Sequence, residues 1–233
     1  MSRVGVVSAL PLEARCLRGS LGRPAARPAE AMVGICGPGP TRAQRTAERM
    51  VAQGAAGLLS WGLAGGIEPG ITSGTLIAAD QVMLASSTAY RTDRAWRQRV
   101  LSALPPRVAV VEAPLFASEG IVATAADKAS LLHRYAAVAV DMESGGIARA
   151  ASRYGLPLLV LRVVVDPVDM ALPPAFADAV DSGGALRPFG LINGLMRQPA
   201  MLWPLLQLAY GARAAGSTLR RIAPVVMDSR TWP

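Results

Sequence analysis

The chain has 233 residues, enough for one α/β domain, and 52% hydrophobic but only 5% aromatic residues predict a core of Val, Leu, Ile and Ala. The net charge of +8, almost all from arginine, is compatible with anionic partners but identifies none. One histidine and two cysteines without metal-site spacing argue against a metal cluster, a Ser-His-Asp triad and a disulfide framework. No apolar run reaches the roughly 18 residues of a spanning helix, so we expect a cytoplasmic protein with reduced thiols.

Short apolar runs bounded by turn residues predict the strands. In chain order they cover residues 4–8, 31–36, 57–61, 75–79, 108–112, 137–140 and 158–164. Helical stretches lie between them at residues 41–53, 94–104, 126–135 and 143–154. Glu13 and Arg15 end the first apolar stretch, which favours a buried strand over a signal peptide. The alternation of strands and helices predicts a largely parallel sheet that is covered on both faces.

The last quarter of the chain departs from this alternation. Two prolines at 173–174 break the pattern, and two apolar segments flanked by arginine follow at residues 189–196 and 201–215. We expect one domain spanning residues 1–233, in which about residues 185–233 form a helical C-terminal extension. The second segment fits a helix that packs on the sheet, which we favour, or an interfacial helix that contacts lipid.

Acidic residues follow or close several predicted strands: Glu13, Glu143 and Asp166. Strand ends are where α/β sheets bind ligands, so these acids and the nearby Arg162 are candidates for acid–base chemistry. Asp141 fits a helix N-terminus, where the macrodipole favours an acid. Asp166 ends an unusually apolar strand, so we expect it to be either paired with an arginine or held for catalysis. Burial can raise the pKa of such a carboxyl enough for it to donate a proton near neutral pH.

Two segments are rich in glycine: Gly-Pro-Gly at residues 37–39 and Gly-Leu-Ala-Gly-Gly at residues 62–66. Glycine lets the backbone approach a ligand closely, and free N–H groups can hold hydroxyls or anions. Neither segment has the Rossmann spacing, and no Walker lysine is present, since Lys128 is the only lysine of the chain. The segments therefore mark close backbone approach without identifying the ligand.

Taken in order, these segments resemble the nucleoside phosphorylase/nucleosidase superfamily over most of residues 4–169, and its methylthioadenosine/S-adenosylhomocysteine nucleosidase branch in particular. The resemblance implies a three-layer α/β fold, with a central mixed, mostly parallel sheet flanked by helices. It assigns Glu13 to the activation of water, Asp166 to the protonation of adenine N7, and Arg162 to the positioning of water or carboxylates. In the Met142-Glu143 pair, the glutamate would grip the ribose hydroxyls.

The glycine-rich loop departs from the family pattern in ways that affect the nucleophile. The family's loop serine is Leu63 here, and Ser60-Trp61 stands where phosphorylases carry an arginine before the loop. Both changes weaken a phosphate site, and the retained glutamate favours water. Phosphorolysis stays open, because Arg42 follows the other glycine segment and can bind an anion.

The resemblance also assigns residues to the substrate pocket. Ala64 and Gly65 of the glycine loop would lie against the substrate, and Ile121 and Val122 would line the site of the purine base. Phe176 would contact the substituent at the ribose 5′ position.

A closer resemblance is to the hopanoid-associated branch of this superfamily. It is carried by Leu63, by Asp-Met-Glu-Ser at 141–144, Asp-Pro-Val-Asp at 166–169 and Ala-Leu-Pro-Pro at 171–174, and by the arginine- and leucine-rich tail. That branch removes adenine from adenosylhopane to give ribosylhopane. A polycyclic lipid on the nucleoside would give the C-terminal segment a reason to contact the inner membrane peripherally.

These observations predict an N-glycosidase of adenine nucleosides, with adenosylhopane as the favoured substrate. The alternatives are a phosphorylase, a nucleosidase for methylthioadenosine or S-adenosylhomocysteine, and a non-catalytic protein that binds a nucleoside or lipid. The resemblance implies a homodimer, and no metal or organic cofactor. The scattered arginines, without interleaved aromatic residues, argue against nucleic acid as a partner.

Overall fold

The computed structural model describes residues 3–18, 31–122, 124–168, 170 and 202–233. In chain order its strands are β1 (Arg3–Ser8), β2 (Ala31–Ile35), β3 (Ala55–Gly66), β4 (Leu76–Ala78), β5 (Gln81–Met83), β6 (Ala89–Arg91), β7 (Val110–Val111), β8 (Leu115–Ala117), β9 (Ala139–Asp141) and β10 (Leu158–Asp166). Its helices are α1 (Pro11–Arg18), α2 (Pro40–Ala52), α3 (Arg94–Ser102), α4 (Ala125–Tyr135), α5 (Ser144–Tyr154) and α8 (Leu202–Val226), followed by the 3-10 turn η2 (Ser229–Thr231).

One sheet forms the middle layer of the molecule, and β3 is at its centre. β3 pairs with β1 and β10 in parallel, and its last residues pair with β9 in the antiparallel direction. The remaining described pairings extend the sheet in the order β6-β5-β8-β9-β3-β10-β4-β7, with β2 at the free side of β1. Parallel pairs predominate, so the predicted mixed, mostly parallel sheet is confirmed.

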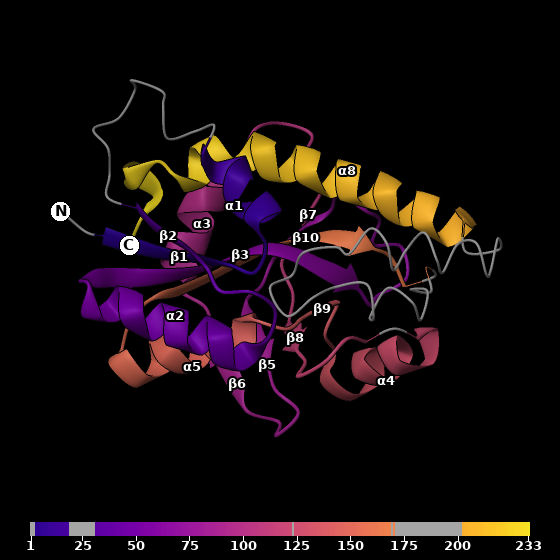
Figure 1. The fold of residues 1–233 in the computed structure, drawn as a ribbon, viewed down its shortest axis with the longest axis horizontal. Helices are drawn as coiled ribbons and strands as arrows, with labels where there is room; N and C mark the ends of the chain where they lie inside the picture. The colour runs from indigo at the N-terminus through magenta and orange to yellow at the C-terminus, as the bar shows by residue number, and fades with distance from the viewer. Residues whose placement is uncertain (1–2, 19–30, 123, 169, 171–201) are drawn as a thin grey trace.

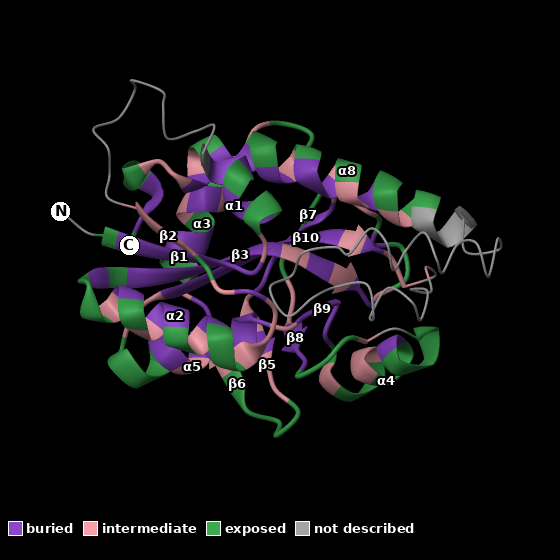
Figure 2. Ribbon diagram, in the orientation of Figure 1, coloured by how far each residue is buried: buried purple, intermediate pink, exposed green. Residues whose placement is uncertain are grey.

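Helices cover both faces of this sheet (Figure 1). α1, α3 and α8 pack on one face, and α2 and α5 pack on the other. Figure 2 shows the consequence: the long strands β1, β3 and β10 are mostly buried, and the helices turn their exposed residues outward. α2 illustrates the cause, because its buried residues Ala43, Thr46, Ala47 and Met50 recur at the spacing of one helical face.

The local sequence explains most element boundaries. Pro40 stands at the first turn of α2, where its missing N–H costs no hydrogen bond, and Gly155 ends α5 in the left-handed conformation. β10 is buried along nearly its whole length, as expected for an apolar strand covered on both faces. These elements lie within a few residues of their predicted positions.

Several elements differ from the sequence prediction. Strands β5, β6 and β8 and helix α1 were not predicted, because each strand has only three residues and α1 only eight. The segment at residues 62–66 was interpreted as a loop, whereas β3 continues through it to Gly66. The prediction was wrong there because glycine, read alone, signals a turn, while the neighbouring strands β9 and β10 hold this stretch extended.

The C-terminal helix α8 is longer than predicted. Its second half packs on the sheet through Ala215, Leu219, Ile222, Ala223 and Val226, and of these only Ala215 belongs to the segment predicted at residues 201–215. Leu206 and Tyr210, nearer its start, are exposed. The segment at residues 189–196 and Phe176 lie outside the described residues. Within the described ranges, no helix combines the length and apolar character needed to cross a bilayer.

Candidate active site

Glu13 lies at the carboxyl end of β1, where α1 begins. The tight connection from β1 into α1 turns its carboxylate back over the strand end, and the amide N–H groups of Ala9 and Leu10 each donate to Oε2 at 2.9 Å. The amide N–H of Leu63 donates to Oε1 at 2.9 Å. A single carboxylate thus joins the first strand to the central one.

The glycine at position 62 is what admits this carboxylate. Gly62 has φ of 156°, and a Cβ built there would lie 2.4 Å from Oε1 of Glu13. Any larger residue would push the carboxylate away from the Leu63 amide. The glycine loop therefore serves the close approach expected from the sequence, although the group that approaches is the protein's own acid.

Arg162 is fully buried in β10, directly in register with Gly62. Its Nη2 donates to Ser60 Oγ at 2.7 Å, its Nε lies 2.8 Å from Asp141 Oδ2, and its Nη1 lies 3.4 Å from Glu143 Oε2. One guanidinium therefore serves two carboxylates. Burial raises the pKa of Glu13, and the charge of Arg162 opposes this rise.

Asp141 is the last residue of β9 and was interpreted from sequence only as a helix N-terminal acid. The amide N–H of Ser144, the first residue of α5, does donate to both carboxylate oxygens at 3.2 Å. The same carboxylate pairs with Arg162, a partner that was not predicted for Asp141. Ser144 Oγ and Ser60 Oγ are 2.9 Å apart, which closes a buried polar ring behind the site.

Glu143 immediately precedes α5 and faces the glycine-rich connection before α2. The amide N–H of Gly39 donates to its Oε1 at 3.1 Å. Burial raises the pKa of Glu143 to about 7, and the neighbouring acids Asp141 and Glu13 add to this, while Arg162 opposes it. Burial likewise raises the pKa of Glu13, against the effect of Arg162 and three amide hydrogen bonds.

Asp166 closes β10, in register with Gly65 of β3. Of the two alternatives expected for Asp166, an arginine partner or a catalytic role, the first is not found among the described residues: the carboxylate pairs with Lys128, whose Nζ lies 2.8 Å from Oδ2. Burial raises the pKa of Asp166, and the ammonium opposes the rise. Lys128 was not among the predicted site residues. A usable signal was its position on the face of α4 that also carries the partly buried Leu131 and Tyr135.

The remaining substrate-binding candidates are placed unevenly. Ala64 is buried and Gly65 partly buried on β3, between the positions of Gly62 and Asp166. Met142 is partly buried between the two acids of its segment. Val122 packs against the small cluster of Ile67, Phe116, Ala137 and Val140, whereas Ile121 is 46% exposed and Phe176 lies outside the described residues.

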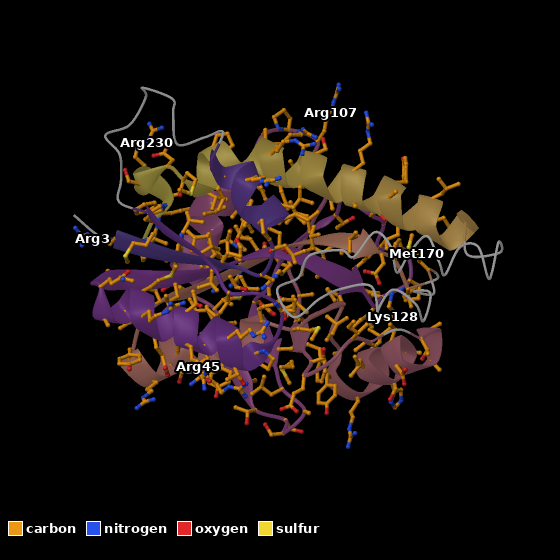
Figure 3. All side chains as sticks on the ribbon, viewed as in Figure 1. Arg3, Arg45, Arg107, Lys128, Met170 and Arg230 are labelled. Carbon is orange, nitrogen blue, oxygen red and sulfur yellow. The ribbon has the colours of Figure 1, made fainter. Side chains whose placement is uncertain are left out.

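Arg42 lies outside the carboxylate group. It is exposed on α2 and lines an open groove of about 730 Å³ with Cys36, Thr46, Glu48, Ala52 and the arginines 45 and 49. Arg45, labelled in Figure 3, shows the outer side of α2 on which this groove lies. The groove can hold an anion, but its arginines do not contact Glu13, Glu143 or Asp166 in the part of the chain that the structure describes.

The structure thus brings Glu13, Glu143 and Arg162 together, and it places Asp166 four residues after Arg162, at the end of β10. Two carboxyl groups with different partners, one held by amides and one by an ammonium, lie at the ends of β1 and β10, the strands that pair with β3 in parallel. Two such carboxyl groups can serve as the base and the acid of one reaction.

The fold matches solved structures along nearly its whole length. A 5′-methylthioadenosine/S-adenosylhomocysteine nucleosidase from Neisseria meningitidis, in complex with methylthio-immucillin-A, has a TM-score of 0.74 at 15% identity, covering 97% of this chain and 99% of that chain. A futalosine hydrolase from Helicobacter pylori has a TM-score of 0.69 at 16% identity, covering 95% and 97%. A Helicobacter pylori 5′-methylthioadenosine/S-adenosylhomocysteine nucleosidase gives the same values. At these identities the likeness shows a shared fold.

No curated protein matches the chain. The family model described as the phosphorylase superfamily matches residues 28–183, about two thirds of the sequence. That match covers β2 to β10, and with them Glu143, Arg162 and Asp166, while Glu13 precedes it. The chain therefore belongs to the phosphorylase superfamily.

Proposed function

We propose that this protein is an N-glycosidase that hydrolyses adenine nucleosides. The observation that carries the proposal is a pair of buried carboxyl groups with different partners: Glu13 is held by three backbone amides, and Asp166 is paired with Lys128. Glu13 belongs to α1 and accepts a hydrogen bond from Leu63 of β3, and Asp166 belongs to β10 and lies in register with Gly65 of β3. Both carboxyl groups therefore lie near the end of β3. Such a pair supplies a base on one side of a bound nucleoside and an acid on the other.

In the proposed reaction the C1′–N9 bond breaks and its electron pair moves into the purine. Asp166 gives a proton to N7, which makes adenine a better leaving group. Glu13 takes a proton from water, whose oxygen attacks C1′. Glu143 accepts hydrogen bonds from the ribose hydroxyls, and Arg162 holds the carboxylates in place. Acid and base contributions are typically about 10²–10⁴-fold each.

Water is favoured over phosphate as the nucleophile because of the charges around Arg162. Its guanidinium is already engaged by Asp141, Glu143 and Ser60. A phosphate dianion placed there would meet carboxylates, and the described part of the chain offers no free cation beside them to balance it. The groove of Arg42 supports the alternative of a phosphorylase, in which phosphate would be captured at α2.

Adenine nucleosides are the substrate class that the structural neighbours support. A Helicobacter pylori nucleosidase mutant has been solved with 5′-methylthioadenosine in its active site. A Colwellia psychrerythraea nucleosidase has been solved with adenine. These ligands are properties of those proteins, and they motivate the choice of test substrates here.

Within this class we propose adenosylhopane as the substrate, with a homodimer that touches the inner membrane through its C-terminal segment. The support is the hopanoid-branch resemblance, with Leu63 in the glycine loop, and the exposed apolar surface of Leu206 and Tyr210 on α8. A lipid substituent would need such apolar surface near the site.

The decisive experiment measures adenine release by the purified protein from adenosylhopane in detergent and from methylthioadenosine, each with and without phosphate. Phosphate-independent release from the lipid nucleoside supports the full proposal. Phosphate dependence indicates a phosphorylase, and preference for methylthioadenosine assigns a smaller substrate.

The variant Asp166→Asn separates catalysis from binding. It keeps the shape of the side chain but removes the proton that Asp166 would donate. We expect folded protein that releases adenine about 10²–10⁴-fold more slowly. Unchanged release would refute the role of Asp166, and binding of nucleoside without turnover in the wild type would identify a binding protein.

A further inference from the structure

Lys128 is the one buried residue of α4, a helix whose other described residues are exposed or partly buried. Its side chain is 0% exposed. It lies where α4 faces the ends of β3 and β10 (Figure 3). A helix normally turns an apolar residue to the core, and a buried ammonium costs several kcal/mol in desolvation unless it is fully paired. The position therefore calls for a reason beyond packing.

The ammonium is held by groups at one place in the chain. Lys128 Nζ lies 2.8 Å from Asp166 Oδ2, and it donates to the backbone carbonyl oxygens of Pro167 at 3.0 Å and Asp166 at 3.5 Å. All of these acceptors belong to the strand end that carries the proposed acid. The three N–H bonds of the ammonium fix both the carboxylate and the backbone that presents it.

No other described charge competes for this carboxylate. On α4, Asp127 is exposed, and its carboxylate accepts a hydrogen bond from the hydroxyl of Thr124. On β10, Arg162 is directed to Asp141 and Glu143, and β3 carries no ionisable side chain. Among the groups that the structure describes, Lys128 is the charged side chain that acts on Asp166.

We propose that Lys128 is a positioning residue for Asp166, which orients the carboxyl group toward the leaving base and stabilises the carboxylate that forms when its proton is transferred. This inference rests on the proposed function. It goes beyond it by assigning to α4, which carries none of the other reacting groups, control over the strength of the acid.

The proton balance defines what the lysine does. Asp166 enters as the neutral acid, its proton bonds to N7 as the C1′–N9 electron pair moves to the purine, and Asp166 leaves as a carboxylate. Water supplies a hydroxyl group to C1′ and a proton to Glu13. Lys128 keeps its own proton throughout. Its positive charge favours the ionised product of the acid, so Asp166 donates more readily but stays protonated over a narrower pH range.

If Lys128 only held α4 against β10, it would make the same contacts. The test therefore needs a measurement that a purely structural role would leave unchanged. The general acid must be protonated, and the rate therefore falls as pH rises through its pKa. Removing the ammonium should raise that pKa by about 1–3 units. The alkaline limb of kcat/KM should then move to higher pH in Lys128→Met, while the plateau rate falls because the acid is weaker.

The experiment measures pH profiles of adenine release, from adenosylhopane in detergent and from methylthioadenosine, for wild type, Lys128→Met, Lys128→Arg and Arg134→Met. Lys128→Arg retains the charge and should keep the limb near its wild-type position. Arg134→Met removes an exposed positive charge from the same helix and serves as the matched control, with an unmoved limb. The double variant Lys128→Met/Asp166→Asn removes both charges of the pair. Its circular dichroism spectrum shows whether the chain folds without the pair.

A second arm does not depend on turnover. In ¹³C-labelled protein, the Asp166 carboxyl signal, assigned by its loss in Asp166→Asn, should titrate at higher pH in Lys128→Met than in wild type. Wild type that releases adenine from neither adenosylhopane nor methylthioadenosine, with the signal shifted, refutes the proposed function and leaves the Lys128–Asp166 pair intact. An unshifted signal, or a shifted signal with an unmoved kinetic limb, overturns the role of Lys128.

Discussion

Arg162 and Asp141 form an ion pair in which Nε and Oδ2 are 2.8 Å apart and neither side chain is more than 1% exposed. The two residues come from β10 and β9, which lie on either side of β3 in the sheet. The pair therefore reaches across the end of the central strand. It ties β10, which ends at Asp166, to β9, which ends two residues before Glu143.

Asp141→Asn should lower the free energy of unfolding by about 3 kcal/mol, because it leaves the buried guanidinium of Arg162 with a weaker partner. Urea unfolding followed by circular dichroism measures the change. Asp127→Asn, at an exposed carboxylate on α4, is the control and should change stability little. Equal stability of the two variants would show that the Asp141 pair contributes nothing net.

Glu13→Gln should reduce kcat for adenine release by about 10²–10⁴-fold, because an amide cannot take the proton of the attacking water. A glutamine keeps the size of the side chain, so binding of adenine, measured by calorimetry, should remain. Gly62→Ala tests the position of the same carboxylate, because the added Cβ would displace Glu13 Oε1, and it should also lower kcat. A Gly62→Ala enzyme with normal kcat would contradict the geometry.

Glu143 predicts a pH dependence of stability. Its pKa is about 7 in the folded protein, against 4.5 ordinarily. Below pH 4.5 the group is protonated in both states, and as pH rises to 7 only the unfolded chain ionises, so stability falls. Relative to Glu143→Gln, the wild type should lose about 3 kcal/mol between pH 4.5 and pH 8. A constant difference across this range would show that burial leaves the Glu143 pKa unchanged.

Gly146 should tolerate no side chain, because α2 and α5 touch at this point. A Cβ there would lie 2.0 Å from the carbonyl oxygen of Pro40. We expect Gly146→Ala to lower the free energy of unfolding by about 1–3 kcal/mol or more through overpacking. Gly216→Ala is the matched control within α8, since its Cβ would approach only the end of the Arg220 side chain. Similar melting temperatures for the two variants would count against this contact.

Both cysteines should react slowly with iodoacetamide at pH 8. Burial raises the pKa of Cys36 to about 12, and its Sγ donates to the carbonyl oxygens of Ser8 and Gly37. Only about one thiol in 10⁴ is then ionised at pH 8. Burial also raises the pKa of Cys16. Mass spectrometry of labelled protein checks this, with urea-unfolded protein as the reactive reference, and rapid labelling of the folded chain would contradict it.

Local patterns in the sequence predicted much of the architecture. Apolar runs marked the positions of β1, β2, β4 and β10, and helical periodicity marked α2 to α5, because burial of one face or of a whole strand leaves a signal within a few residues. Strands of three residues leave too little signal, which is why β5, β6 and β8 were missed. The end of β3 was missed because its glycines are held extended by other strands.

The sequence by itself determined that the chain is a mostly parallel α/β protein and that Glu13, Glu143 and Asp166 stand near strand ends. Only the tertiary structure decided which charges meet. Asp166 pairs with Lys128, 38 positions away, and not with an arginine, and Arg162 pairs with Asp141 across the central strand. Such pairings depend on how helices and strands pack at long range, and the energy of a buried charge depends on that packing, which no local pattern records.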